Sequence, residues 1–207
     1  MKPAQIKAFL FREIKENGTL FAVLFTAMTV FSGFVRLIFI VLLVSKTLPA
    51  NIENGRSRIF SSLPFTKNTV FFSSLGLSLF TSLTSALLHT LIFKNTPVFT
   101  TSYSGIYSTI TDETGLITAA VTTLFFFGLS TAGARKGLSS IGLSAIVIIA
   151  IYLLTPLSSV MGIRETFEFF NPLRSGTEIF NPVMPIIYGV FLTCLSYRMF
   201  SKGGMSR

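Results

Sequence analysis

Residues 115–157 decide the fold, and they read GLITAAVTTLFFFGLSTAGARKGLSSIGLSAIVIIAIYLLTPL. Two apolar runs, 115–134 and 138–157, are separated only by Arg135, Lys136 and Gly137. A helix of about 20 apolar residues crosses the hydrocarbon core of a bilayer. The stretch therefore predicts two membrane-spanning helices joined by a tight turn, as a helical hairpin.

The composition extends this interpretation to the whole chain. Of its 207 residues, 50% are hydrophobic and 12% are charged, about half the charged fraction of an average soluble domain. These values exclude an ordinary soluble domain, a disordered chain and a disulfide-stapled secreted domain. We expect an all-α integral membrane protein that forms one domain over residues 1–207 and has about six transmembrane helices.

Two further apolar runs indicate two more spans. Residues 70–93 and 183–200 are each bounded on both sides by polar or charged residues. Residues 1–16 have a different pattern, because their apolar side chains recur at spacings of three and four between basic ones. This pattern predicts an amphipathic helix that lies in the membrane interface and ends at Asn17 and Gly18.

Residues 18–45 allow two interpretations. Their 28 residues are long for one helical span and short for two. A single span places Arg36 near the middle of the membrane, which costs at least about 2.5 kcal/mol. A short hairpin that turns near Ser32 and Gly33 places Arg36 at the far surface, where its side chain can reach water. We favour the hairpin.

The distribution of charge predicts the orientation. One set of segments carries thirteen Lys or Arg residues and three acidic ones, and the other set carries three basic and five acidic residues. The basic segments belong in the cytoplasm by the positive-inside rule. They include both ends of the chain, so we expect both termini to be cytoplasmic in a multi-pass protein of the plasma membrane. The basic set comprises 1–17, 46–68, 135–137 and 198–207; the other comprises 94–114 and 158–182.

Residues 46–68 form a basic cytoplasmic connection that also carries apolar side chains. Phe60 and Phe65 are suited to anchoring in a partner's pocket, while Arg56, Arg58 and Lys67 set the orientation of that partner. The alternative is an amphipathic segment that rests on anionic lipid.

The same connection resembles a known family. Glu53-Asn-Gly-Arg56 is followed by Ile59-Phe-Ser-Ser-Leu-Pro64-Phe-Thr-Lys67 and then directly by a span. This order is similar to the coupling region of permease subunits of ATP-binding-cassette (ABC) exporters of the type-2 class. Residues 1–16 of this chain resemble the elbow helix of that class. The length of the chain and residues 128–142 resemble the CcmB-type haem exporter permeases within the class.

The resemblance implies a transport subunit without catalytic residues or a bound cofactor of its own. It implies that a hydrophobic or amphipathic substrate crosses the membrane by means of ATP and Mg, which belong to a separate ATPase subunit. The expected partners are that ATPase, a second permease copy or paralogue, and membrane lipids, without nucleic acid. The residues expected to couple to the ATPase are Glu53, Arg56, Arg58, Phe60, Leu63, Pro64, Phe65 and Lys67.

A polar stripe follows one face of the expected helix 70–93. Its members are spaced by three or four residues, which aligns them along that helix. Small hydroxyl side chains allow helices to approach closely, which favours a helix interface; the alternative is a weakly polar wall along a transport path. The stripe consists of Ser74, Ser78, Ser82, Ser85 and His89.

Other classes of function lack the residues that they need. The sequence has no Gly-x-x-x-x-Gly-Lys-Ser/Thr phosphate loop and no cluster of His and Cys with metal-ligand spacing. His89 is the only histidine, and we expect it to bond to a neighbouring helix rather than to a metal. An intramembrane enzyme is therefore disfavoured. A structural or assembly protein without transport remains the alternative function.

Overall fold

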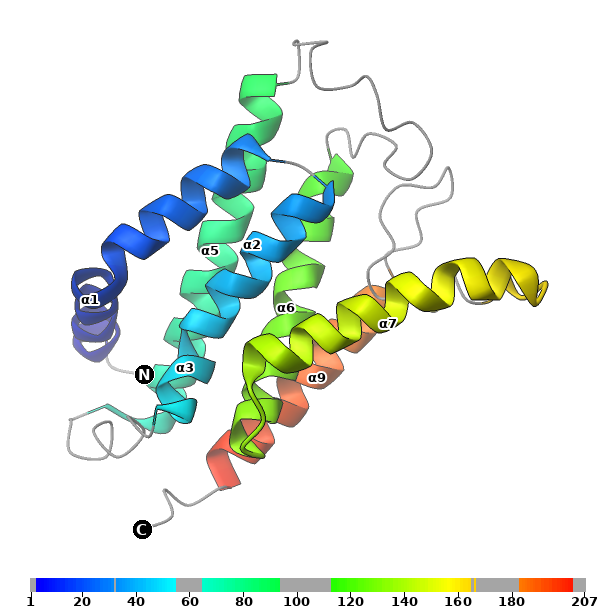
Figure 1. Cartoon of the computed structure of the whole chain (residues 1–207). Coiled ribbons are helices and arrows are strands. Elements are labelled where there is room, and N and C mark those ends of the chain that lie inside the picture. The colour runs from blue at the N-terminus through cyan, green and yellow to red at the C-terminus, as the bar shows by residue number, and fades with distance from the viewer. Residues whose placement is uncertain are drawn as a thin grey trace.

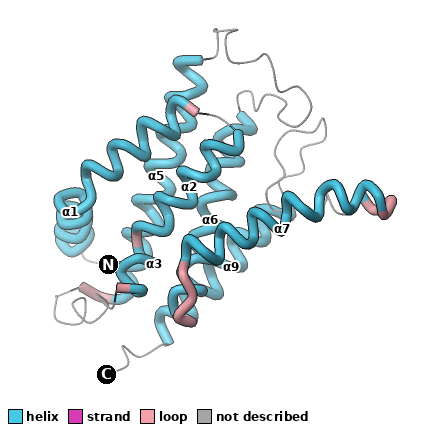
Figure 2. Tube along the Cα trace, viewed as in Figure 1, coloured by secondary structure: helices cyan, strands magenta, loops and turns pink. Residues whose placement is uncertain are grey.

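The computed structural model of the chain describes residues 3–31, 33–54, 65–93, 113–164, 166 and 183–202, without the side chains of 33, 34 and 113–115. Within these residues there are seven helices and no strand, which confirms the expected all-α class. The helices are α1 (Pro3–Val30), α2 (Gly33–Lys46), α3 (Leu48–Glu53), α5 (Lys67–Phe93), α6 (Glu113–Arg135), α7 (Ser140–Val160) and α9 (Val183–Lys202). Figure 2 shows that short loops join the helices where the chain is described.

In the part of the chain that the structure describes, four helices are long and apolar enough to cross a membrane, namely α5, α6 from Leu116, α7 and α9. They coincide within a few residues with the four runs that the sequence marks as clear spans. The turn between α6 and α7 contains Gly137, whose φ is +77°. Glycine adopts this left-handed conformation without steric cost, so the tight turn forms where the sequence predicts it.

Residues 18–45 form parts of two helices rather than one. Helix α1 ends at Val30 and α2 begins at Gly33, so the chain turns at the position that the hairpin interpretation requires. Helix α2 has only 14 residues and extends about 21 Å. It is therefore shorter than the hydrocarbon core of a typical bilayer.

The expected break at Asn17 and Gly18 is wrong. Helix α1 is continuous from Pro3 to Val30, although Figure 1 shows that its first part runs in a different direction from its second part. The Asn17 amide donates to the Glu13 carboxylate one turn earlier, at 3.3 Å. A side chain at Gly18 would meet only Ile14. A glycine in this setting lowers helix stability by about 1 kcal/mol without ending the helix.

Helix α6 lies at the centre of the bundle, where it packs against α2, α3, α5, α7 and α9. Figure 1 shows α2, α5 and α6 running side by side, while α7 leaves the bundle obliquely and its second half projects away from the other helices. That half exposes apolar side chains such as Leu153 and Val160. An exposed apolar helix of this kind is suited to contact with lipid.

Helices α6 and α9 approach each other closely at two glycines. A Cβ atom at Gly128 would lie 2.5 Å from the backbone carbonyl carbon of Leu192. Gly189 on α9 fits beside Leu124 in the same interface, and the Thr193 hydroxyl donates to the Leu124 carbonyl at 3.0 Å. Small residues at the crossing thus allow the two backbones to touch.

An aromatic cluster fills the core at one end of the bundle. The ring of Phe71 on α5 lies 5.4 Å from that of Phe127 on α6, 5.2 Å from Tyr197 and 5.9 Å from Phe200 on α9. The first two pairs meet edge to face, which is a favoured arrangement for aromatic rings. This packing fixes the start of α5 against the end of α9.

Candidate coupling site

The described residues among those expected to bind a partner, Glu53, Phe65 and Lys67, lie at one end of the bundle. There, the Lys67 ammonium of α5 donates to the carbonyl of Ser201 at 3.1 Å, and the Arg135 guanidinium donates to that of Phe200 at 3.3 Å. These contacts gather the start of α5 and the ends of α6 and α9. Figure 1 shows the start of α1 and helix α3 at the same end. The described parts of the basic segments therefore lie together.

Lys67 and Arg135 also stabilise the end of helix α9. The last carbonyls of a helix have no partner within the helix and carry partial negative charge. Two cations from neighbouring helices satisfy carbonyls of that last turn, and the Arg135 guanidinium also lies 5.6 Å from the ring centre of Phe200. The role of Lys67 shown by the structure is thus to join α5 to α9.

Helix α3 leads from the bundle into residues 55–64. Thr47 precedes it, and the Thr47 hydroxyl donates to the Val44 carbonyl at 2.7 Å. Pro49 stands near its first turn, where the missing N–H of proline has no helical partner to lose. Leu48, Pro49 and Asn51 are buried, so this short helix is packed against the bundle.

A buried carboxyl of α1 holds one side of α3. Glu13 is 2% exposed, and its carboxylate accepts from the side-chain amides of Asn51 on α3 and Asn17 on α1, each at 3.3 Å. Asn51 also donates to the Thr47 carbonyl at 3.2 Å. Burial raises the pKa of Glu13 above its ordinary value of 4.5, and the hydrogen bond from Asn51 opposes that increase.

A second carboxylate joins the end of α3 to the start of α7. One oxygen of Glu53 accepts from the backbone N–H of Ser140, the first residue of α7. The Ser139 hydroxyl accepts from the N–H of Gly142 at 3.3 Å. A negative charge at this position interacts favourably with the helix dipole of α7. Glu53 therefore connects α3 mechanically to the turn between α6 and α7.

Three of the eight expected coupling residues are described in the structure. Glu53 and Lys67 make the contacts given above, and the ring of Phe65 packs edge to face on Phe9 of α1 with 6.0 Å between ring centres. Phe65 is half-buried, so part of the ring stays accessible. The other five, Arg56, Arg58, Phe60, Leu63 and Pro64, lie outside the described residues.

The polar stripe of α5 faces other helices of the same chain. Ser74, Ser78, Ser82 and Ser85 are all buried. The Ser78 hydroxyl lies 3.4 Å from that of Thr47, and the Thr123 hydroxyl of α6 donates to that of Ser82 at 2.8 Å. These are the contacts of a helix interface. Whether the same face also borders a transport path stays a prediction.

His89 lies at the opposite end of α5 and binds the end of helix α1. Its Nδ1 atom is 2.8 Å from the Thr29 carbonyl oxygen. Arg36 acts at the same helix end, because its Nε donates to the carbonyls of Met28 at 2.9 Å and Phe31 at 3.2 Å. Arg36, for which the sequence predicts contact with water, is instead buried as a cap on α1.

The sequence reasoning missed several residues of the coupling site. It placed Glu13 among the charges of a basic segment, although Glu13 is buried, and it gave Asn51 and Ser140 no role. The Thr47-Leu48-Pro49 sequence is typical of a helix start and could have revealed α3. The described residues contain no group of three or more His, Cys, Asp or Glu side chains that could hold a metal ion.

Comparison of the chain with protein-family models, curated proteins and solved structures found no match.

Proposed function

We propose that the chain is the membrane-spanning permease subunit of an ABC exporter of the type-2 class. It uses ATP hydrolysis by a separate ATPase subunit to move a hydrophobic or amphipathic substrate across the plasma membrane. It functions beside a second permease copy or paralogue, with both termini in the cytoplasm. Residues 1–16 act as the interfacial elbow helix, and the α1–α2 hairpin completes six crossings.

The observation that carries this proposal is the attachment of α3 on both sides. Asn51 in this helix binds Glu13 of α1, and Glu53 at its end binds the N-terminus of α7. Residues 55–64, which resemble a coupling helix, follow α3 directly. A displacement of those residues by a docked ATPase is thus passed to two helices, as a rigid-body mechanism requires.

The character of the substrate is inferred from the apolar helices. The four spans carry few charges, and the hydroxyls of Ser78 and Ser82 in the polar stripe of α5 contact hydroxyls of other segments of the same chain. A charged cargo needs compensating charges along its path. An apolar or amphipathic cargo does not, so it fits this bundle better.

Co-purification in detergent with the ATPase encoded by a neighbouring reading frame tests the proposal. We expect the wild-type chain to retain the ATPase and the double variant Phe60→Ala/Arg58→Glu to lose it, because an anchor and an orienting charge are removed together. Phe191→Ala, which removes an exposed ring of α9, is the matched control and should retain the ATPase. A folded wild-type chain that binds no ATPase would instead favour the structural or assembly function.

A further inference from the structure

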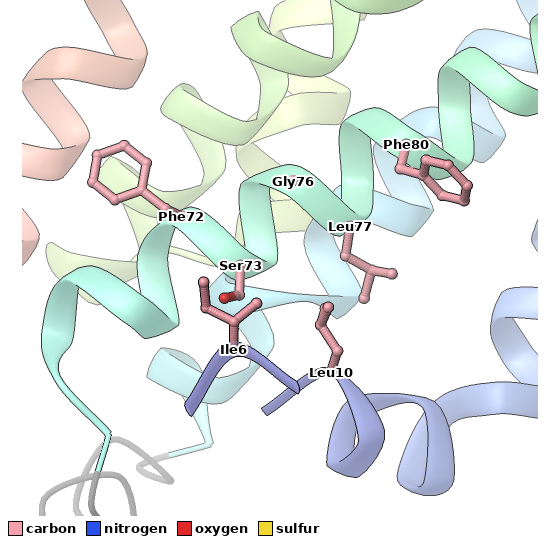
Figure 3. Close-up of a pocket in the computed structure, with 7 residues that line it drawn as sticks. All are labelled: Ile6, Leu10, Phe72, Ser73, Gly76, Leu77 and Phe80. Carbon is pink, nitrogen blue, oxygen red and sulfur yellow. The ribbon is translucent and has the colours of Figure 1, made fainter. Parts of the chain in front are cut away.

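An apolar groove lies between the first part of α1 and the first half of α5. Its volume is about 260 Å³. Figure 3 shows side chains of α1 on one side and of α5 on the other, with Ser73 pointing toward α1. The lining residues are Ile6 and Leu10 of α1 and Phe72, Ser73, Gly76, Leu77 and Phe80 of α5.

The groove opens toward the surroundings of the bundle rather than into its core. Phe72 and Phe80 line it and are 43% and 70% exposed. Between them, Gly76 has no atom within 4 Å of the position that a Cβ would take. The absence of a side chain at Gly76 therefore leaves open space along α5.

One polar group points into this apolar surface. Ser73 is 7% exposed, and its hydroxyl has no hydrogen-bond partner. Most serines elsewhere in α5, such as Ser78 and Ser85, donate to a carbonyl of their own helix. A buried hydroxyl without a partner is costly, so an acceptor supplied by a ligand would stabilise this site.

The surroundings and the size of the groove identify its occupant. Helix α5 meets the length and hydropathy of a membrane span, so its outer face contacts lipid. The groove is larger than the cavity of about 150 Å³ that binds benzene in an engineered apolar site. It has seven lining residues, whereas a stable protein interface uses about 20–30 residues on each side. An acyl chain fits it better than a second copy does.

The basic end of the bundle favours a phospholipid from the same leaflet. Lys7 follows Ile6 directly and is exposed, as is Lys15 on the same helix. Phe11 and Ile14 of that helix segment are also exposed, at 70% and 54%. A helix that presents both cations and large apolar side chains is suited to lie among headgroups and acyl chains.

We propose that the α1–α5 groove binds one acyl chain of a membrane phospholipid, with the Ser73 hydroxyl donating to an ester oxygen of that lipid. The lipid fills the space above Gly76 and holds the first part of α1 against α5. This binding site is independent of ATPase docking and of the transported substrate.

Photolabelling of the full chain in nanodiscs tests the site. The bilayer contains phosphatidylglycerol and phosphatidylethanolamine with a diazirine on an acyl chain, and labelled peptides are identified by mass spectrometry. We expect label to concentrate on residues 72–80. Gly76→Leu should lower that labelling about tenfold, because it displaces two or more methylene groups from the groove.

Ala145→Leu is the matched control, since Ala145 is an exposed small residue of α7 away from the groove; it should leave labelling at 72–80 unchanged. Ser73→Ala, which keeps the packing, should lower labelling severalfold and supplies a second readout if Gly76→Leu does not fold. Uniform labelling of all spans that neither groove variant changes would overturn the proposal. So would a change of oligomeric state in Gly76→Leu, because the groove would then bind a second copy. Neither of these two outcomes would affect co-purification with the ATPase, so the lipid site and the proposed function are tested separately.

Discussion

Glu13 shows how a single buried carboxyl can organise one end of a helical bundle. Its two acceptor oxygens bind Asn17 in its own helix and Asn51 in α3. A carboxylate removed from water is costly, and the two amides compensate for part of that cost. The side chain therefore specifies where α3 sits on α1, even as its burial lowers stability at neutral pH.

The raised pKa of Glu13 predicts a dependence of stability on pH. The folded protein holds this proton more tightly than the unfolded chain, so the free energy of unfolding decreases as pH rises from about 4.5. At pH values above the raised pKa of Glu13, deprotonation of this carboxyl lowers the free energy of unfolding no further. Glu13→Gln should abolish this part of the decrease, as measured by thermal unfolding in detergent followed by circular dichroism. Lys15→Gln, which removes an exposed charge of the same helix that has no part in the pKa shift of Glu13, is the control; identical profiles for wild type and Glu13→Gln would contradict the assignment.

At the scale of elements, the contact between α6 and α9 depends on Gly128. The Cβ added by Gly128→Ala meets backbone atoms of α9, so the helices must separate. We expect a loss of about 1–3 kcal/mol in the free energy of unfolding, measured by titration with SDS in mixed micelles. Gly76→Ala is the matched control, because its new methyl group enters open space. The higher helix propensity of alanine should increase the free energy of unfolding of this variant by up to about 1 kcal/mol. Equal effects of the two substitutions would refute the close approach.

The Glu53 contact predicts a local effect on α7. Glu53→Ala removes an acceptor and a negative charge from the helix N-terminus, a change that costs about 0.3–1 kcal/mol at an exposed site. The amides of residues 140–143 should then exchange hydrogen faster, as measured by mass spectrometry. Glu16→Ala removes a different exposed carboxylate and should leave that segment unchanged. Unaltered exchange in Glu53→Ala would show that the carboxylate does not hold α7.

The sequence predicts the four apolar spans well because local composition determines them. The polar sequence Arg135-Lys136-Gly137 predicts a turn from its local composition alone. The change from polar to apolar residues after Lys67 likewise predicts the start of a span. The contacts between elements could not be predicted in this way. In the sequence, Glu13 and Arg36 look like charges that face solvent, and only the packing of the helices buries them. The continuity of α1 through Gly18 and the fit of Gly128 against Leu192 depend likewise on distant residues. The fold class was therefore accessible from sequence, while the contacts that assemble the candidate coupling site were not.

At the scale of the whole molecule, the bundle has two ends with different chemistry. Lys67 and Arg135 hold the end of α9, whereas His89 and Arg36 hold the end of α1. Helix α5 supplies a side chain to each group and so connects both ends. Helix α5 thus links the two ends of the bundle, while α6 is the helix against which most of the others pack.

The charge distribution predicts the topology. In a Cys194→Ser background, which lacks the single native cysteine, Lys7→Cys and Lys202→Cys should both resist a membrane-impermeant maleimide added to intact cells. They should react once the membrane is opened, because the proposed topology places both ends of the chain in the cytoplasm. Reaction of only one of them in intact cells would mean an odd number of crossings and would exclude the six-span plan.

The most direct test of the proposed function is photocrosslinking to the ATPase from a single position. Ser57→Cys, next to the expected docking residue Arg58, is made in the Cys194→Ser background, labelled with benzophenone-maleimide and illuminated in membranes that contain both subunits. Ile92→Cys, at an exposed site near the other end of α5, is the control. The proposal predicts a covalent adduct with the ATPase from position 57 and none from position 92. An ATPase that crosslinks from neither position, although both variants are folded and labelled, would contradict the assignment of residues 55–68 as its docking site.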